Sequence, residues 1–216
     1  VMINHFDFAV KSYVSGAGNR AQWADQESGR RIIRPQFLMG QSDFGDRRKA
    51  KFAFRSIARS TDRRSMIGTA IPGFPTGNSL GVLEISRGSP IQLAGLASSL
   101  TFDYLLRLRM TGTNVNWFLL SETPVISPKT VEGINRISIS LAGTHITYAA
   151  YTDTYPSTWI IDPTARIKAK AELDARVALL YGFDESDLAY ILSECDHPVD
   201  KLSQKAFARG LDPRGF

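Results

Sequence analysis

Apolar and polar residues follow two different spacings along the chain, and the change occurs near Gly88. Before that point the apolar residues form short runs, several of them alternating with polar residues, between clusters of turn-forming residues. Such runs are typical of β-strands joined by turns. The expected strands are 1–14, 32–39, 51–58, 66–71 and 80–85, with a Gly-rich loop at 15–31 and turns at 40–48 and 72–78.

After Gly88 the apolar residues recur every three or four positions, which indicates helices. Ser89 before Pro90 is the pattern of an N-cap followed by a proline in the first turn, and we expect that helix to reach about Met110. Asp162 and Gly182 mark the start and the end of the most strongly indicated helix. The remaining expected elements are a strand at 115–120 and helices at 130–150 and 185–194.

The pattern therefore predicts an α+β fold, with a β-rich N-terminal half packed with a helical C-terminal half. The expected portions are 1–88 and 89–216, either separate or as one continuous domain. A chain of 216 residues with 43% hydrophobic residues can bury a sizeable core. No run approaches the ~20 apolar residues that span a bilayer, and no signal peptide is recognisable at the start. We expect a cytoplasmic protein without membrane contact, cut from a longer chain.

Positive charge is concentrated in one stretch. From Arg30 to Arg64 there are eleven Arg or Lys residues and three acidic residues, whereas the whole chain has a net charge of +5. Arg47, Arg48 and Lys49 are part of this stretch. A localised basic field is typical of proteins that bind polyanions. The alternative is a solvated basic surface that has no partner.

Catalytic motifs are missing from the sequence. It has no phosphate-binding loop of the Walker type and no Gly-x-Ser-x-Gly elbow. His5, His145 and His197 lack the spacing of metal ligands. Chemistry on a DNA base needs a cofactor site and a pocket for the extruded base. The sequence has neither a Gly-rich loop for S-adenosylmethionine nor an Asn/Asp-Pro-Pro-Tyr tetrapeptide. We therefore expect no catalytic residue, cofactor or metal in this chain.

One basic segment combines arginines with short polar residues. Arg55, Arg59 and the pair Arg63-Arg64 lie four residues apart, and Ser60-Thr61-Asp62 lies between the last two. Arginine matches phosphate and the paired acceptors of guanine, and Thr61 suits a phosphate contact. Asp62 is interpreted as a turn cap or a partner of an arginine rather than a reader of cytosine. In the expected strand, Phe52, Phe54 and Ile57 form an apolar side opposite Arg55 and Arg59.

A second polar cluster, Thr111-Gly112-Thr113-Asn114-Val115-Asn116, follows the expected helix. Asparagine can bind adenine with two hydrogen bonds, so Thr113, Asn114 and Asn116 are candidate DNA contacts. The alternative is a helix C-cap, with Asn114 in a left-handed conformation.

Five segments together resemble the C-terminal specificity region of type IIG-like restriction–modification enzymes, the large adenine-specific DNA methyltransferases. They lie at 2–7, 54–67, 77–78, 102–116 and 172–192, in the order that the family has, and they span nearly the whole chain. The segment 54–67 is the most specific of them. Phe8-Ala9 departs from the family, which often has a basic residue there, and 15–31 is individual to this chain.

The resemblance implies a target recognition domain, in which 1–88 recognises DNA downstream of a methyltransferase domain of the same parent chain. It implies that Arg55, Arg59, Thr61, Arg63, Arg64 and Asn78 lie on or near the surface facing double-stranded DNA. The S-adenosylmethionine and the catalytic tetrapeptide would belong to the parent enzyme, upstream of Val1. The alternative is an interaction module whose helical half docks a separate catalytic or nuclease subunit. A third option, a stand-alone enzyme, has no motif to support it.

Overall fold

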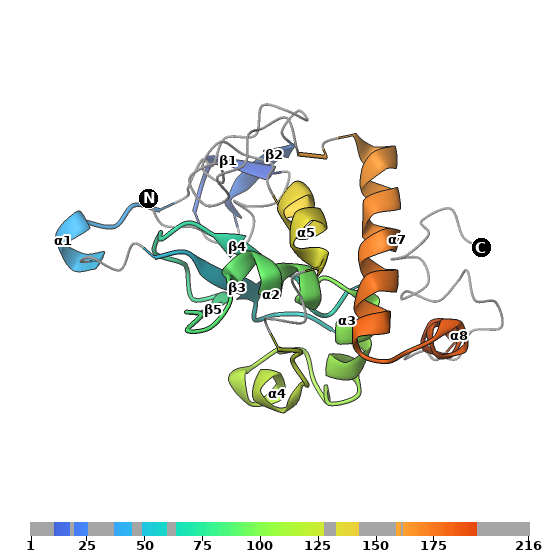
Figure 1. Ribbon diagram of the computed structural model, residues 1–216. Coiled ribbons are helices and arrows are strands. Elements are labelled where there is room, and N and C mark those ends of the chain that lie inside the picture. The colour runs from blue at the N-terminus through green and yellow to red at the C-terminus, as the bar shows by residue number, and fades with distance from the viewer. Residues whose placement is uncertain are drawn as a thin grey trace.

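The computed structural model describes residues 11–17, 20–25, 37–44, 49–59, 64–127, 133–142, 159–160 and 162–193 (Figure 1). It has the expected α+β architecture. The strands are β1 (Lys11–Ser15), β2 (Gln22–Asp25), β3 (Lys51–Arg55), β4 (Gly68–Ile71) and β5 (Leu80–Leu83). The helices are α1 (Gln41–Phe44), α2 (Pro90–Ala97), α3 (Leu100–Arg107), α4 (Trp117–Glu122), α5 (Asn135–Ala142), α7 (Pro163–Leu180) and α8 (Glu185–Ser193).

The central sheet has the order β4-β3-β5, and both pairings are antiparallel. Phe52 and Phe54 on β3 belong to the main hydrophobic core, whereas Ala53 packs on the other face in a smaller cluster with Ile71 and Leu80. β3 is thus covered on both faces, and even Lys51 is only 8% exposed. The expected basic side of this strand is therefore confined to its end, from Arg55 onward.

Two glycines make room for the phenylalanine rings of β3. A Cβ atom on Gly81 would overlap the ring of Phe54, and one on Gly68 would overlap the ring of Phe52. Because each glycine pairs with a β3 residue in the neighbouring strand, the rings can lie across the adjacent backbone. The strands on either side of β3 therefore need glycine at these two positions.

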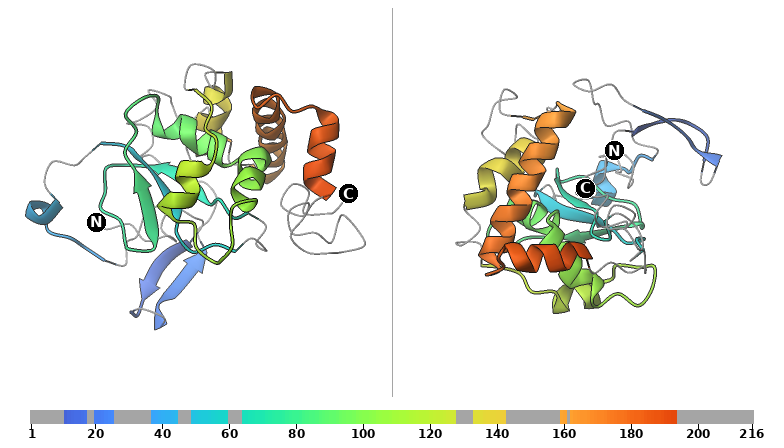
Figure 2. Two further views of the ribbon diagram at one scale, coloured as in Figure 1. Left: turned by 90° about the horizontal axis from the view of Figure 1, so that it is seen from below. Right: turned by 90° about the vertical axis from the view of Figure 1, so that its right-hand side faces the viewer.

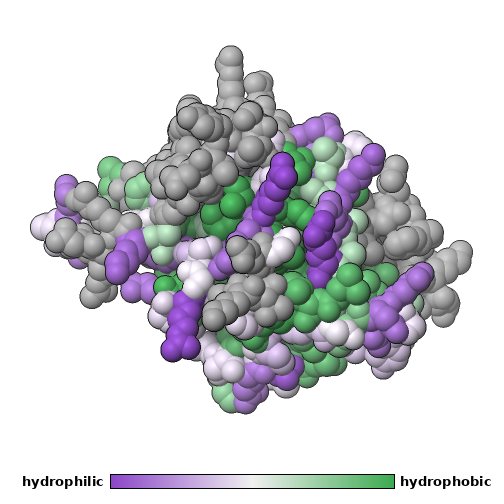
Figure 3. Space-filling model, in the orientation of Figure 1, coloured by the Kyte–Doolittle hydropathy of each residue, from purple (hydrophilic) through white to green (hydrophobic). Residues whose placement is uncertain are grey.

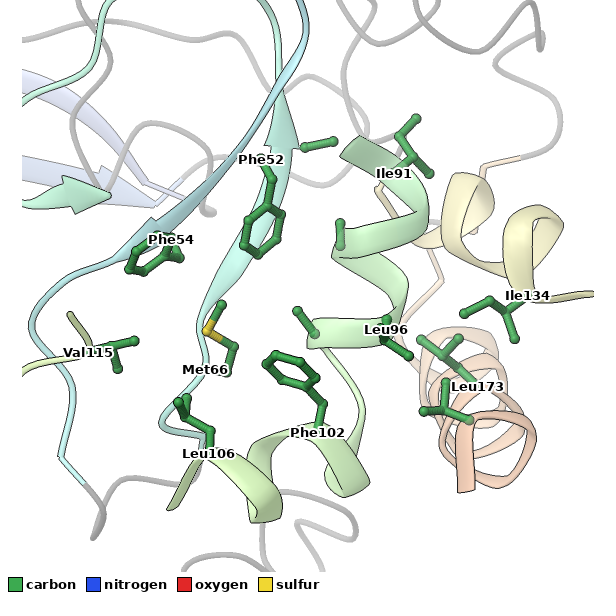
Figure 4. Close-up of a cluster of buried hydrophobic side chains, with 14 of the residues drawn as sticks. Phe52, Phe54, Met66, Ile91, Leu96, Phe102, Leu106, Val115, Ile134 and Leu173 are labelled. Carbon is green, nitrogen blue, oxygen red and sulfur yellow. The ribbon is translucent and has the colours of Figure 1, made fainter. Parts of the chain in front are cut away.

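Helices cover the sheet in successive layers (Figures 1 and 2). α2 packs on β3 and β4, α5 packs on α2, and α7 packs on α5 and α3, while α8 contacts α3. The main core combines residues of both halves of the chain, among them Phe52, Leu96 and Leu173 (Figure 4). Hydrophilic residues lie over the outer helices, with hydrophobic residues among them (Figure 3). The β1–β2 ribbon projects from this body (Figure 2).

Several expected elements are confirmed. β4 and β5 lie within the predicted strands, and Asp162 caps α7 by accepting a hydrogen bond from the Ala165 amide at 2.7 Å. Gly182 ends that helix with φ of +78°, and Asp184 accepts from the Asp187 amide at the start of α8. The expected strand 1–14 and helix 130–150 are described only in part, by β1 and α5. Residues 32–36 lie outside the described residues.

Three predictions about elements were wrong. The expected helix 89–110 is two helices, because the Ser99 side chain accepts from the Phe102 amide and caps α3 as a new helix. The expected strand 115–120 is mostly α4, which begins after the extended residue Asn116. The expected loop 15–31 contains β2, held to β1 by backbone pairing and by an edge contact of Tyr13 with Trp23. The short α1 lies in the expected turn 40–48.

No helix in the described part of the chain is long and apolar enough to cross a membrane.

Candidate nucleic-acid interface

Three segments that are far apart in the sequence meet at the backbone of Ser56, just beyond the end of β3. The Ser56 amide donates to the Ser79 carbonyl at 3.0 Å, and the Ser56 carbonyl accepts from the Val115 amide at 2.8 Å. A third hydrogen bond joins the Ala58 amide to the Thr113 carbonyl at 3.0 Å. The end of the basic strand, the turn before β5 and the polar cluster before α4 therefore form one surface, which we call the Ser56 edge (residues 55–59, 77–79 and 113–116).

Exposure alternates along the strand end. Ala58 is buried at 2% exposure, whereas Ile57 is 57% exposed and Arg59 is exposed. The prediction that Ile57 shares an apolar side with Phe52 and Phe54 was wrong. Side chains alternate with a period of two in a strand, so Ala58 follows the phenylalanines and Ile57 does not. Ile57 instead lies between Arg55, which is half-buried, and Arg59 on the outer side.

Asn114 lies directly opposite Ile57 in an antiparallel bridge. Its interpretation as a helix C-cap was wrong, because α3 ends at Arg107 with Leu108 as its C-cap. Thr113 and Asn116 on either side are exposed, as is Asn114 itself. The structure thus places all three predicted residues of this cluster next to the basic strand, which no local pattern in the sequence indicated.

Asn78 lies in the turn that leads into β5. The Leu80 amide donates to the Gly77 carbonyl at 3.0 Å and closes this turn, and Asn78 is exposed at its tip. Because Leu80 pairs with Arg55 and Ser79 bonds to Ser56, Asn78 lies at the Ser56 edge. Its predicted contact with DNA stays a prediction.

Buried hydrogen bonds fix both ends of the basic segment between Arg59 and Ser65. The Ser65 hydroxyl donates to the Arg59 carbonyl at 2.9 Å and joins the two ends. The buried carboxylate of Asp103 accepts from the amides of Ser65 and Met66 at 2.9 and 2.6 Å. Asp103 also accepts from Nε of Arg107 at 2.8 Å. The base of the segment is therefore held by α3, a contact across almost 40 positions that sequence reasoning missed.

Arg64 lies against α7. Its Nη2 is 3.5 Å from Oδ2 of Asp174, and its side chain is 20% exposed. Asp174 also accepts from the Leu100 amide at 2.6 Å, at the start of α3. Burial raises the pKa of Asp174, while the Arg64 guanidinium and the Leu100 amide oppose that rise. Arg64 thus helps to fix the segment to the helices, and its predicted DNA contact stays a prediction.

The other candidate residues have different placements. Lys49 is exposed but precedes β3, so it lies roughly 20 Å along the strand from Ser56. Arg47, Arg48, Thr61 and Arg63 lie outside the described residues. Of the predicted contacts, the structure therefore brings together Arg55, Arg59, Asn78, Thr113, Asn114 and Asn116.

Two exposed aromatic residues beside this cluster were missed. Trp117 and Phe118 begin α4 and are 52% and 63% exposed. The Trp117 ring meets the buried Phe54 ring edge-on, with centroids 5.4 Å apart. The sequence places both in the strand expected at 115–120, where alternation would bury one of them. In α4 both are exposed instead.

The surface offers hydrogen-bonding and cationic groups. Among the described residues, no group of His, Cys, Asp or Glu is arranged to hold a metal ion. The exposed groups at the Ser56 edge are an arginine, three asparagine side chains, a threonine and an isoleucine. Such groups can contact phosphates and base edges.

Comparison with protein families finds no match, and neither does comparison with curated proteins. Among solved structures, the chain is similar to one described as the type IIL restriction–modification enzyme MmeI in complex with DNA. The identity is 14%, the TM-score is 0.46, and the match covers 74% of this chain and 22% of that chain. A likeness at this level assigns neither a fold family nor an activity, and the chain spans about a fifth of its neighbour's length.

Proposed function

We propose that this chain binds double-stranded DNA and serves as the target recognition domain of an adenine-specific restriction–modification methyltransferase. The observation that carries the proposal is the meeting of three segments at Ser56. It gathers arginine and asparagine side chains from positions 55 to 116 on one edge, with their backbones fixed by hydrogen bonds. Rigidly held polar groups beside cationic ones are what recognition of DNA requires.

The role within a larger enzyme rests on the sequence resemblance. The segments that carry it include 54–67, 77–78 and 102–116, and these same segments form the Ser56 edge and its support on α3. On this proposal S-adenosylmethionine and the catalytic residues belong to another domain of the parent chain, and this domain positions the DNA.

DNA binding is tested with the chain itself and fluorescently labelled duplexes that have a randomised centre, at several salt concentrations. We expect Arg55→Ala/Arg59→Ala to weaken binding and to reduce the slope of log affinity against log salt by about 2, one for each lost phosphate contact. The matched control is Arg136→Ala/Arg176→Ala, which has the same net charge and changes exposed arginines on α5 and α7. Circular dichroism checks that both variants fold.

Two results would overturn the proposal: no binding to any duplex at low salt, or equal weakening by the two double variants. Stable co-purification with a separate subunit, retained in Arg55→Ala/Arg59→Ala, would favour the docking alternative instead. Methyl transfer from labelled S-adenosylmethionine to DNA by this chain alone would contradict the assignment of catalysis to another domain.

A further inference from the structure

We propose that Ile57 and Asn114 act as a pair that recognises a single A·T base pair from the major groove of DNA. The inference rests on the proposed function and specifies what the Ser56 edge would distinguish.

The bridge places the two side chains next to each other. Ile57 and Asn114 are flanked by the Val115-to-Ser56 and Ala58-to-Thr113 hydrogen bonds, at 2.8 and 3.0 Å. They are therefore the non-hydrogen-bonded type of antiparallel pair, in which the Cα atoms lie about 4.5 Å apart. Side chains of such a pair extend from the same face. Both residues are exposed, Ile57 to 57%.

The backbone that carries the pair is firmly anchored. Ala58 and Val115, which follow Ile57 and Asn114 along the chain, are 2% and 1% exposed and belong to the main core. A side chain mounted on such a backbone is presented in a nearly fixed position, which base recognition requires. Arg55 and Arg59 on either side of Ile57 are suited to hold phosphates.

The chemistry of the pair matches A·T and no other base pair equally well. In the major groove adenine presents the N7 acceptor and the N6 donor, and an asparagine amide can satisfy both. The paired thymine presents its C5 methyl group, which an isoleucine can cover. Guanine presents two acceptors, so the side-chain carbonyl of Asn114 would find no donor there. Cytosine has no methyl group for Ile57 to cover. An exposed isoleucine by itself is ordinary, so its pairing with Asn114 is what carries the inference.

The test selects binding sites from a pool of duplexes with a randomised centre, using the wild-type chain, Asn114→Ala, Ile57→Ala and the control Leu179→Ala. Leu179 is 70% exposed on α7 and is not one of the residues of the Ser56 edge. We expect the wild type and the control to require A·T at one position. Asn114→Ala should lose a preference of about tenfold or more for adenine at that position alone.

Replacing the thymine of that base pair by uracil isolates the methyl group. We expect this change to weaken binding by the wild type and by Asn114→Ala, and to leave binding by Ile57→Ala unchanged. The inference is overturned if the two variants change preference at different base pairs, if they weaken all sites equally, or if uracil has no effect on the wild type. It is also overturned if no A·T position is selected. Failure of the wild type to bind any duplex would instead refute the proposed function itself.

Discussion

Two ion pairs in this protein have the same spacing and the same length but different surroundings. Arg107 and Asp103 on α3 are four residues apart, with Nε and Oδ2 separated by 2.8 Å. Arg176 and Glu172 on α7 are also four residues apart, with Nη2 and Oε1 separated by 2.8 Å. The side chains of the first pair are 5% and 1% exposed, and those of the second are 51% and 52% exposed. The pairs thus isolate the effect of burial.

We expect Arg107→Met to lower the free energy of unfolding by about 3–5 kcal/mol, because it leaves the buried Asp103 carboxylate without its cation. The amides of Ser65 and Met66 still donate to Asp103, which places the loss at the lower end of this range. Arg176→Met should cost at most about 0.5 kcal/mol, since water screens an exposed pair. Methionine keeps helix propensity and replaces the aliphatic part of the arginine side chain in both variants.

Urea denaturation followed by circular dichroism measures both changes. We expect the midpoint to fall strongly for Arg107→Met and hardly at all for Arg176→Met, with the slope unchanged. Losses that differ by less than about 1 kcal/mol would refute the view that burial makes the Asp103–Arg107 pair important. Because Asp103 also holds the base of the basic segment, Arg107→Met should weaken DNA binding more than Arg176→Met at temperatures where both remain folded.

Two further predictions concern ionisable groups. Burial raises the pKa of Asp174 above its usual 3.8 and Arg64 opposes the rise, so Asp174 contributes stability at low pH that is lost as pH rises through its folded pKa. Arg64→Met should raise the pKa of Asp174 further and make the free energy of unfolding fall more steeply with pH above 4. Urea midpoints measured across pH would show this change. An unchanged dependence of stability on pH would contradict the pairing of Arg64 with Asp174. Burial raises the pKa of Tyr181 to about 12, so its contribution is present below pH 10 and lost through about pH 12. In an ultraviolet pH titration the wild type should show one tyrosine that ionises near pH 12, and Tyr181→Phe should lack it. A wild-type titration without such a tyrosine would refute this prediction.

The amino-acid sequence by itself determined the elements whose signals are local. Asp162 and Gly182 bound α7 because a cap and a left-handed glycine act within one helical turn. The α+β class and the strands β4 and β5 followed from the spacing of apolar residues. The concentration of positive charge before residue 65 is also a property of the sequence, and no folding is needed to see it.

Local signals failed where two tendencies of similar strength competed. The helical spacing from Ser89 to Met110 continues through Ser98 and Ser99, and only the side-chain cap at Ser99 divides α2 from α3. Ile57 is as apolar as the core residues before it, but the period of the strand places it outside. In the first case the spacing of apolar residues missed the break between two helices, and in the second hydrophobicity alone suggested the wrong environment.

The tertiary structure alone decided the candidate interface. The bonds that join Ser56 to Ser79 and Val115, and Asp103 to Ser65 and Met66, link positions more than 20 residues apart. Each depends on the packing of the core beneath it, which aligns β3, β5 and the segment before α4 so that their free backbone groups meet. A sequence specifies which polar residues are available, but the requirement that buried backbone groups find partners determines which of them lie side by side.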